Sequence, residues 1–282
     1  MALATNSPLI RIYNRSTLDA RLLSSHADTV LCLDATSDGT ILASAGKDKS
    51  ARLWMLSSAS DRSEMDWSCV AVAEGHAESI GALALSRNDA PSPQFMFTGS
   101  QDRTVKMWDI TNVKSSPSNE AEKLKSLLTL KVHDKGINSL DVAPNDKLLA
   151  TGSQDKTANI YEIEFVSGAK LKGSLKLLGT CKGHKRGVWC VKFSRTERFV
   201  ATASGDKSIK LWSLDDFSCL KVSDCAVPRS LKLTLPHPRP LRDTQTPYFE
   251  LISLLRGSNS SAQPLMAWLK YGRSRTKNAL PV

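Results

Sequence analysis

The chain of 282 residues alternates apolar and polar positions in short runs that polar turns separate. Runs such as "VLCLDA" from residue 30, "FMFTGS" from residue 95 and "VWCVKF" from residue 188 are rich in Val, Ile, Leu and Thr. A period of two over four to eight residues is typical of half-buried strands, whereas an amphipathic helix needs a period near 3.6. The pattern therefore predicts an all-β protein built from many short strands.

These runs recur as one unit of similar content. Four units begin at His26, His76, His133 and His184, which follow one another at separations of 50, 57 and 51 residues. Each unit contains four apolar runs, and a phrase such as "LLATGSQDKTANIYEI", which begins at Leu148, spans the second and third. One four-stranded sheet cannot bury both of its faces, whereas sheets stacked around an axis can. The repeat therefore predicts the blades of a propeller.

The same four kinds of side chain stand at matching places in every unit. A hydroxyl lies four residues before an Asp, and an aromatic lies six residues after that Asp. The sets are His26, Ser44, Asp48 and Trp54; His76, Thr98, Asp102 and Trp108; His133, Thr151, Asp155 and Tyr161; and His184, Thr202, Asp206 and Trp212. His, Asp and Trp at this spacing resemble the WD40 β-propeller repeat, and the resemblance covers residues 26–221.

The resemblance implies a structural role for each set. In WD40 blades the His lies in the loop before the first strand, the Asp in the turn before the third strand, and the aromatic on that strand. A buried polar group without a partner costs about 1–3 kcal/mol, so we expect each set to form one buried hydrogen-bond chain. We expect a modified chain in the third unit, because the phenol of Tyr161 reaches differently from an indole.

A hydrolase triad is the competing interpretation of His, Asp and Ser in one unit. A triad is needed once, in a cleft with an oxyanion site, whereas four copies at one spacing indicate architecture. The sequence also lacks a glycine-rich phosphate loop, and no cysteine pair has the C-x-x-C spacing of a metal or redox site. We therefore predict no enzyme activity, no metal, no cofactor and no small-molecule substrate.

The repeats divide the chain into six predicted segments. Residues before the first complete unit match the end of a blade, with Tyr13 at the aromatic position and Ser7 in place of the Asp. The predicted segments are the last two strands of a blade (1–25), four complete WD40 blades (26–75, 76–132, 133–183 and 184–221) and a basic, Pro-rich, mostly disordered tail (222–282). About four and a half blades should not close a ring. We therefore expect either a fragment of a longer product, such as a truncated gene model, or an edge that partners cover.

Composition and charge bear mainly on the tail and on location. The net charge is +10, and residues 222–282 hold nine Lys or Arg against three Asp or Glu, with seven of the twelve prolines. A short helix near "YFELISLL" or "PLMAWLK" is the one element expected there. Two insertions, "SSASDRSEMDWS" and "TNVKSSPSNEAEKLKS", are expected to be surface loops. No membrane-length apolar run or signal peptide is present, and the six cysteines are interpreted as buried thiols in a reducing compartment.

The amino-acid sequence of the repeats resembles that of one subgroup of the family. The sequence from "ATNSPLIRIY" to "FSCLK" resembles that of the second of two propellers in WD40 proteins of the nucleolar small-subunit processome. This resemblance implies a scaffold in pre-18S rRNA processing in the nucleus and nucleolus. Its implied partners are other processome proteins, among them WD40 subunits, and the U3 small nucleolar ribonucleoprotein, with RNA contact direct or indirect.

A general WD40 adaptor is the alternative that remains, either a ubiquitin-ligase substrate receptor or a signalling scaffold. Such receptors often carry Trp-Asp-x-Arg after the third strand, and the equivalents in this chain are "WMLS", "WDIT", "YEIE" and "WSLD". The missing Arg argues against a receptor. A general adaptor is therefore the second hypothesis.

Basic residues recur beside the repeated Asp and predict the surface that partners contact. The residues concerned are Lys49, Arg103, Lys156 and Lys207, with Lys185 and Arg186 in an adjacent loop. A positive rim suits RNA phosphates or an acidic peptide, although an exposed turn also tolerates Lys and Arg without any ligand. We expect no aromatic stacking platform beside these charges, so direct recognition of single-stranded RNA is not predicted.

Overall fold

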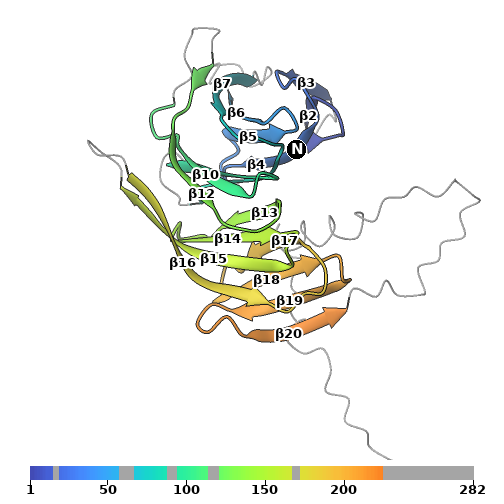
Figure 1. Ribbon diagram of the computed structural model, residues 1–282. Helices are drawn as coiled ribbons and strands as arrows, with labels where there is room; N and C mark the ends of the chain where they lie inside the picture. The colour runs from blue at the N-terminus through green and yellow to red at the C-terminus, as the bar shows by residue number, and fades with distance from the viewer. Residues whose placement is uncertain (15–18, 57–66, 88–93, 114–120, 167–171, 225–282) are drawn as a thin grey trace, which may run out of the picture. The chain divides into compact units, whose positions relative to one another are not determined.

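The computed structural model describes residues 1–14, 19–56, 67–87, 94–113, 121–166 and 172–224. These residues form twenty strands in five sheets, and the described part of the chain contains no helix. The predicted all-β class, with successive four-stranded blades, is confirmed (Figure 1). We describe the unit Met1–Val227 by itself.

Each complete unit contributes four strands in antiparallel order, and the four sheets follow one another along the chain. The first contains β4 (Val30–Ala35), β5 (Ile41–Gly46), β6 (Ser50–Leu56) and β7 (Trp67–Glu74). The second contains β8 (Ile80–Leu85), β9 (Phe95–Ser100), β10 (Thr104–Asp109) and β12 (Ser126–Lys131). The third contains β13 (Ile137–Val142), β14 (Leu148–Ser153), β15 (Thr157–Val166) and β16 (Lys172–Lys182). The fourth contains β17 (Val188–Phe193), β18 (Phe199–Ser204), β19 (Ser208–Ser213) and β20 (Cys219–Asp224).

Neighbouring sheets bury each other's apolar faces. Strand β4 lies against β8, β8 against β13, and β13 against β17, so the first strands of successive units are neighbours. The apolar clusters confirm this arrangement, since each spans two units. Leu53 and Trp108 belong to one cluster, and Phe97 and Tyr161 to the next. A single sheet would leave these side chains in water, so the units stabilise one another by burial.

A bulge recurs beside each repeated aromatic. The pairing of the third and fourth strands shifts register between Leu53 and Trp54, and equivalent shifts precede the aromatic in the other three units. A bulge bends a strand and redirects a side chain. The shift therefore re-aims the aromatic ring relative to a regular ladder.

The N-terminal segment differs from the prediction of two strands. It forms a three-stranded sheet of β1 (Ala2–Ala4), β2 (Leu9–Tyr13) and β3 (Ala20–Ser24). Strand β1 covers only three residues, which is too short for an alternating pattern to be recognised in the sequence. Ser7, expected in place of the turn Asp, accepts a hydrogen bond from the Leu9 amide at 3.2 Å.

Part of the second insertion is also more regular than expected. A two-residue strand, β11 (Glu122–Lys123), pairs in parallel with β7 and gives the first complete unit a fifth strand. The Leu124 amide donates to the Val72 carbonyl at 2.8 Å and extends this contact. Residues 57–66 and 114–120 of the two insertions lie outside the described residues.

The last strand continues through Asp224, three residues past the predicted end of the final blade. The rest of the predicted tail, with its expected helix, lies outside the described residues. Five cysteines are described and all are free thiols; Cys181 and Cys190 are buried as predicted, Cys32 and Cys69 are half-buried, and Cys219 is exposed. Its place on the outermost strand of the last sheet explains the exposure. In the described part of the chain, no helix has the length and apolarity of a membrane span.

Candidate functional site

The second unit shows the repeated polar set most simply. His76 Nδ1 lies 2.9 Å from Asp102 Oδ2, and His76 Nε2 lies 2.8 Å from Thr98 Oγ1. The Trp108 indole donates to the same Thr98 oxygen at 2.8 Å. An indole only donates, so the Thr98 hydroxyl donates its own hydrogen to His76 Nε2, and Nδ1–H donates to the carboxylate. The chain of donors therefore runs from Trp through Thr and His to Asp.

The first and fourth units contain the same chain. His26 lies 2.7 Å from both Asp48 and Ser44, and Trp54 donates to Ser44 at 2.8 Å. In the fourth unit, the corresponding distances are 2.9 Å for His184 to Asp206, 2.7 Å for His184 to Thr202, and 2.7 Å for Trp212 to Thr202.

The third unit has a modified chain. His133 lies 2.8 Å from Asp155 and 2.7 Å from Thr151, as in the other units. The Tyr161 hydroxyl does not reach Thr151; it donates to the Val132 carbonyl at 3.3 Å instead.

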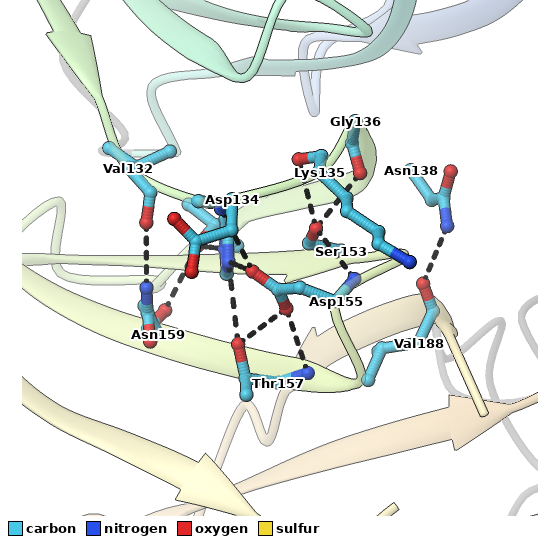
Figure 2. Close-up of polar contacts among 12 residues, drawn as sticks. Val132, Asp134, Lys135, Gly136, Asn138, Ser153, Asp155, Thr157, Asn159 and Val188 are labelled. Carbon is cyan, nitrogen blue, oxygen red and sulfur yellow. Dashed lines mark hydrogen bonds and ion pairs between the residues drawn. The ribbon is translucent and has the colours of Figure 1, made fainter. Parts of the chain in front are cut away.

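An asparagine on the same strand completes the modified chain. Asn159 Nδ2 also donates to the Val132 carbonyl, at 2.9 Å (Figure 2). The same nitrogen lies 3.3 Å from the Tyr161 hydroxyl. The Thr151 hydroxyl thus receives no indole hydrogen. The side chains of this strand hydrogen-bond to the backbone before the histidine, and the hydroxyl lies 3.4 Å from the Asn159 carbonyl instead of an indole.

Burial and hydrogen bonding set the protonation of these groups. Burial lowers the pKa of each histidine below its usual value, and the neighbouring carboxylate only partly offsets this effect. Burial alone would raise the pKa of Asp102, but hydrogen bonds from Thr104 and His76 outweigh it and lower the pKa to about 2. The imidazoles are therefore neutral and the carboxylates ionised near pH 7.

This arrangement explains what the four sets can do chemically. The histidine side chains are 0–1% exposed and both ring nitrogens are occupied. A general base must present a free nitrogen to a substrate. The sets are therefore placed to hold loop, turn and strand together, and any interaction with a partner has to come from the surface around them. No cluster that could hold a metal ion occurs in the described residues.

Isosteric removal of one hydroxyl tests the hydrogen-bond chain. We expect Thr98→Val to cost about 1–3 kcal/mol more unfolding free energy than Thr151→Val, because it strands two buried nitrogens, His76 Nε2 and Trp108 Nε1. Thr151→Val strands one buried nitrogen, His133 Nε2, and removes a 3.4 Å contact with the Asn159 carbonyl. Urea unfolding of both variants at pH 7.5 measures the difference, and equal losses would contradict this assignment of donors.

The predicted basic residues lie in the turns between the second and third strands. Lys49, Arg103, Lys156 and Lys207 all adopt left-handed backbone conformations, with φ of 64°, 71°, 78° and 68°. Their side chains are exposed. The structure brings the fourth turn next to the loop of Lys185 and Arg186, because the Lys185 amide donates to Asp206 at 2.8 Å.

Two ion-paired carboxylates on the first strands of the units were not predicted from the sequence. Asp34 on β4 accepts from the Leu85 amide of β8 at 2.9 Å and from the Arg87 guanidinium at 2.7 Å. Asp141 on β13 accepts from the Phe193 amide of β17 at 2.9 Å, and Lys192 lies 2.5 Å away. The carboxylates thus link neighbouring units. The partners are about 50 residues apart, so no local pattern signals them.

An exposed tryptophan was also missed. Trp189 on β17 is 44% exposed, although it lies within an apolar run that predicts a buried strand. It stands beside the basic loop of Lys185 and Arg186, so the expectation that no aromatic accompanies the charges does not hold. Alignment of the four first strands shows the signal, because the equivalent positions are Leu31, Gly81 and Asn138.

The repeats, sheets and polar sets together define the class of this protein. Residues 19–55, 67–109, 124–162 and 175–213 match the WD40 family (WD domain, G-beta repeat). The matched segments make up more than half of the chain, which therefore belongs to the WD40 family, as the sequence predicted.

Within that family, the chain is similar to transducin beta-like protein 3. It is 42% identical to the Mus musculus protein over 197 residues and 41% identical to the Homo sapiens protein over 196 residues. It is 37% identical over 201 residues to U3 small nucleolar RNA-associated protein 13 of Saccharomyces cerevisiae. Each alignment covers 68% of this chain but only 22–23% of the relative. The chain thus spans about a fifth of the length of these relatives.

Proposed function

We propose that the chain is a non-catalytic scaffold that binds proteins and ribonucleoprotein in the small-subunit processome, and so acts in pre-18S rRNA processing in the nucleolus. The similarity to transducin beta-like protein 3 and to the yeast U3 small nucleolar RNA-associated protein carries this proposal. Its partners are other processome proteins, including WD40 subunits, and the U3 small nucleolar ribonucleoprotein.

The distribution of side chains supports binding at the surface. The repeated polar sets are internal and saturated with hydrogen bonds, whereas the four turns beside them present exposed cations. Positive turns attract phosphates and acidic peptides and raise the rate of association. A ribonucleoprotein supplies both kinds of ligand.

Affinity capture of the tagged full chain tests the proposal. We expect enrichment of U3 small nucleolar RNA and processome proteins. The matched variant replaces the four turn cations by Asn, which tolerates a left-handed backbone, and should reduce the recovery. The control replaces four exposed lysines of other strands by Gln: Lys123, Lys131, Lys172 and Lys176.

The general adaptor is the alternative outcome of the same experiment. Recovery of cullin adaptors or signalling subunits, without U3 RNA, would replace the processome proposal by that one. Equal loss of U3 RNA in the control variant would show that total charge, rather than the turns, is responsible.

A further inference from the structure

One exposed aromatic side chain lies beside the basic loop and turn of the fourth unit. Trp189 is the second residue of β17, and its side chain lies over Gly205 in the turn that carries Lys207. A Cβ at position 205 would come within 2.8 Å of Trp189 Nε1 and 3.6 Å of the Arg186 Cβ. The indole, Arg186 and this turn are therefore immediate neighbours.

The fourth unit differs at this place from the second and third. Their equivalents of Gly205 are Gln101 and Gln154, which are joined by a 2.9 Å hydrogen bond between Gln154 Nε2 and Gln101 Oε1. Asn138, the equivalent of Trp189, donates to the Val188 carbonyl at 2.9 Å (Figure 2). These amides are used within the protein, whereas the fourth unit has a glycine that makes room for an exposed indole.

The charge of the fourth unit also differs. The loops that follow the histidines carry Asp28 in the first unit, Glu78 in the second and Asp134 beside Lys135 in the third, but Lys185 and Arg186 without an acid in the fourth. Within the described residues, neither of these two cations nor Lys207 forms an ion pair.

The acid of the fourth turn, Asp206, is used within the protein. Asp206 accepts hydrogen bonds from His184 Nδ1 at 2.9 Å and from the Lys185 and Ser208 amides at 2.8 and 2.9 Å. Its carboxylate is therefore engaged within the turn. With this ionised carboxylate counted, the loop and the turn carry three exposed cations and a net charge of +2 beside one exposed indole.

We propose that this patch, formed by Lys185, Arg186, Trp189, Gly205 and Lys207, binds single-stranded RNA directly. A base stacks on the indole of Trp189, and the cations hold the adjoining phosphates. Stacking on an aromatic within a cationic surface is the general mode of single-strand binding, and it needs an unpaired base. The proposal deepens the proposed function by assigning an RNA contact to this chain.

The charges alone would also suit an acidic peptide, but the exposed indole favours RNA. A carboxylate-rich peptide gains little from the face of an aromatic ring, since that face carries negative potential. A nucleobase offers a flat ring to stack on it, and each stacked base contributes substantially to affinity. The peptide is therefore an outcome of the test.

The test is the binding of a fluorescein-labelled ten-nucleotide oligouridine to the purified full chain, followed by anisotropy at several salt concentrations. We expect Trp189→Ala to weaken binding about five- to 150-fold, and Trp189→Phe to retain most of it. We expect Arg186→Gln and Lys207→Asn to lower the slope of log affinity against log salt by about 0.7 each. Leu220→Ala, which truncates a side chain that is 59% exposed on β20, is the matched control and should bind as the wild type does.

Two further measurements separate stacking from charge. We expect an abasic oligomer of the same length to bind the wild type as weakly as oligouridine binds Trp189→Ala. Gly205→Gln restores the amide of the second and third units, displaces the indole and should also weaken binding.

Several results would overturn the proposal. Equal affinity for the abasic and intact oligomers would do so, as would an oligoglutamate peptide that binds tighter than RNA and depends on Trp189. Binding of purified RNA is independent of the capture experiment. Loss of U3 RNA from the capture, with Trp189-dependent binding intact, would reject the processome role alone.

Discussion

Lowering the pH from 7.5 to 5.5 is expected to remove much of the stability of this fold. Burial lowers the pKa of His26, His76, His133 and His184 in the folded chain, while in the unfolded chain each titrates near 6.5. The unfolded state therefore binds more protons, and the unfolding free energy decreases as the pH is lowered. The contribution of the four histidines to stability is complete above about pH 6.5 and is lost as the pH drops from there through their lowered folded pKa values.

The size of this effect follows from the number of histidines. At pH 5.5, each histidine that is neutral when folded and titrates at 6.5 when unfolded costs up to about 1.4 kcal/mol, and four cost up to about 6 kcal/mol. The unfolding free energy of a domain is only about 5–15 kcal/mol, so the loss is large. Urea unfolding between pH 5.5 and 8 measures it.

The carboxylates act in a separate and lower pH window. The pKa of Asp102 is lowered to about 2, and those of Asp48, Asp155 and Asp206 are also lowered. Their contribution is present above about pH 3.8 and is lost only as the pH falls through the lowered values. A transition near pH 6 therefore reports the histidines. The slope of the unfolding free energy against pH gives the number of protons taken up on unfolding. A value below one between pH 5.5 and 6.5 would show that the histidines are charged in the folded chain.

Asp141→Ala is expected to destabilise the chain by about 3–5 kcal/mol. Asp141 and Lys192 are 8% and 11% exposed, so removal of the carboxylate leaves a buried charge without its partner. The Phe193 amide of the next unit also loses its acceptor. Urea unfolding at pH 7.5 gives the change in free energy.

Two comparisons identify the cause of that loss. Asp215→Ala breaks an ion pair with Arg198 in which both side chains are more than 60% exposed, and it should cost less than about 1 kcal/mol. The double variant Asp141→Ala/Lys192→Met removes both charges and should recover most of the stability. A double variant as unstable as Asp141→Ala would locate the effect in the lost backbone hydrogen bond.

Local patterns were sufficient for the repeated unit and insufficient for its exceptions. The alternating runs and the recurring His, Asp and aromatic residues predict four sheets, because strand formation and tight turns depend on neighbouring residues. The three-residue strand β1 and the two-residue strand β11 carry no such pattern. They form because a neighbouring strand, β2 or β7, offers an edge that can pair.

The sequence by itself determined the fold class, the number of complete units and the residues of each polar set, because these recur at fixed spacings along one chain. Only the tertiary structure decided which groups meet between units, as with Asp34 and Arg87, which lie 53 residues apart in sequence and 2.7 Å apart in space. It also decided that Trp189 is exposed beside cations, although its run predicts a buried strand. The physical reason is that burial and charge pairing depend on which sheets stack, and the local pattern of apolar and polar residues does not specify these contacts.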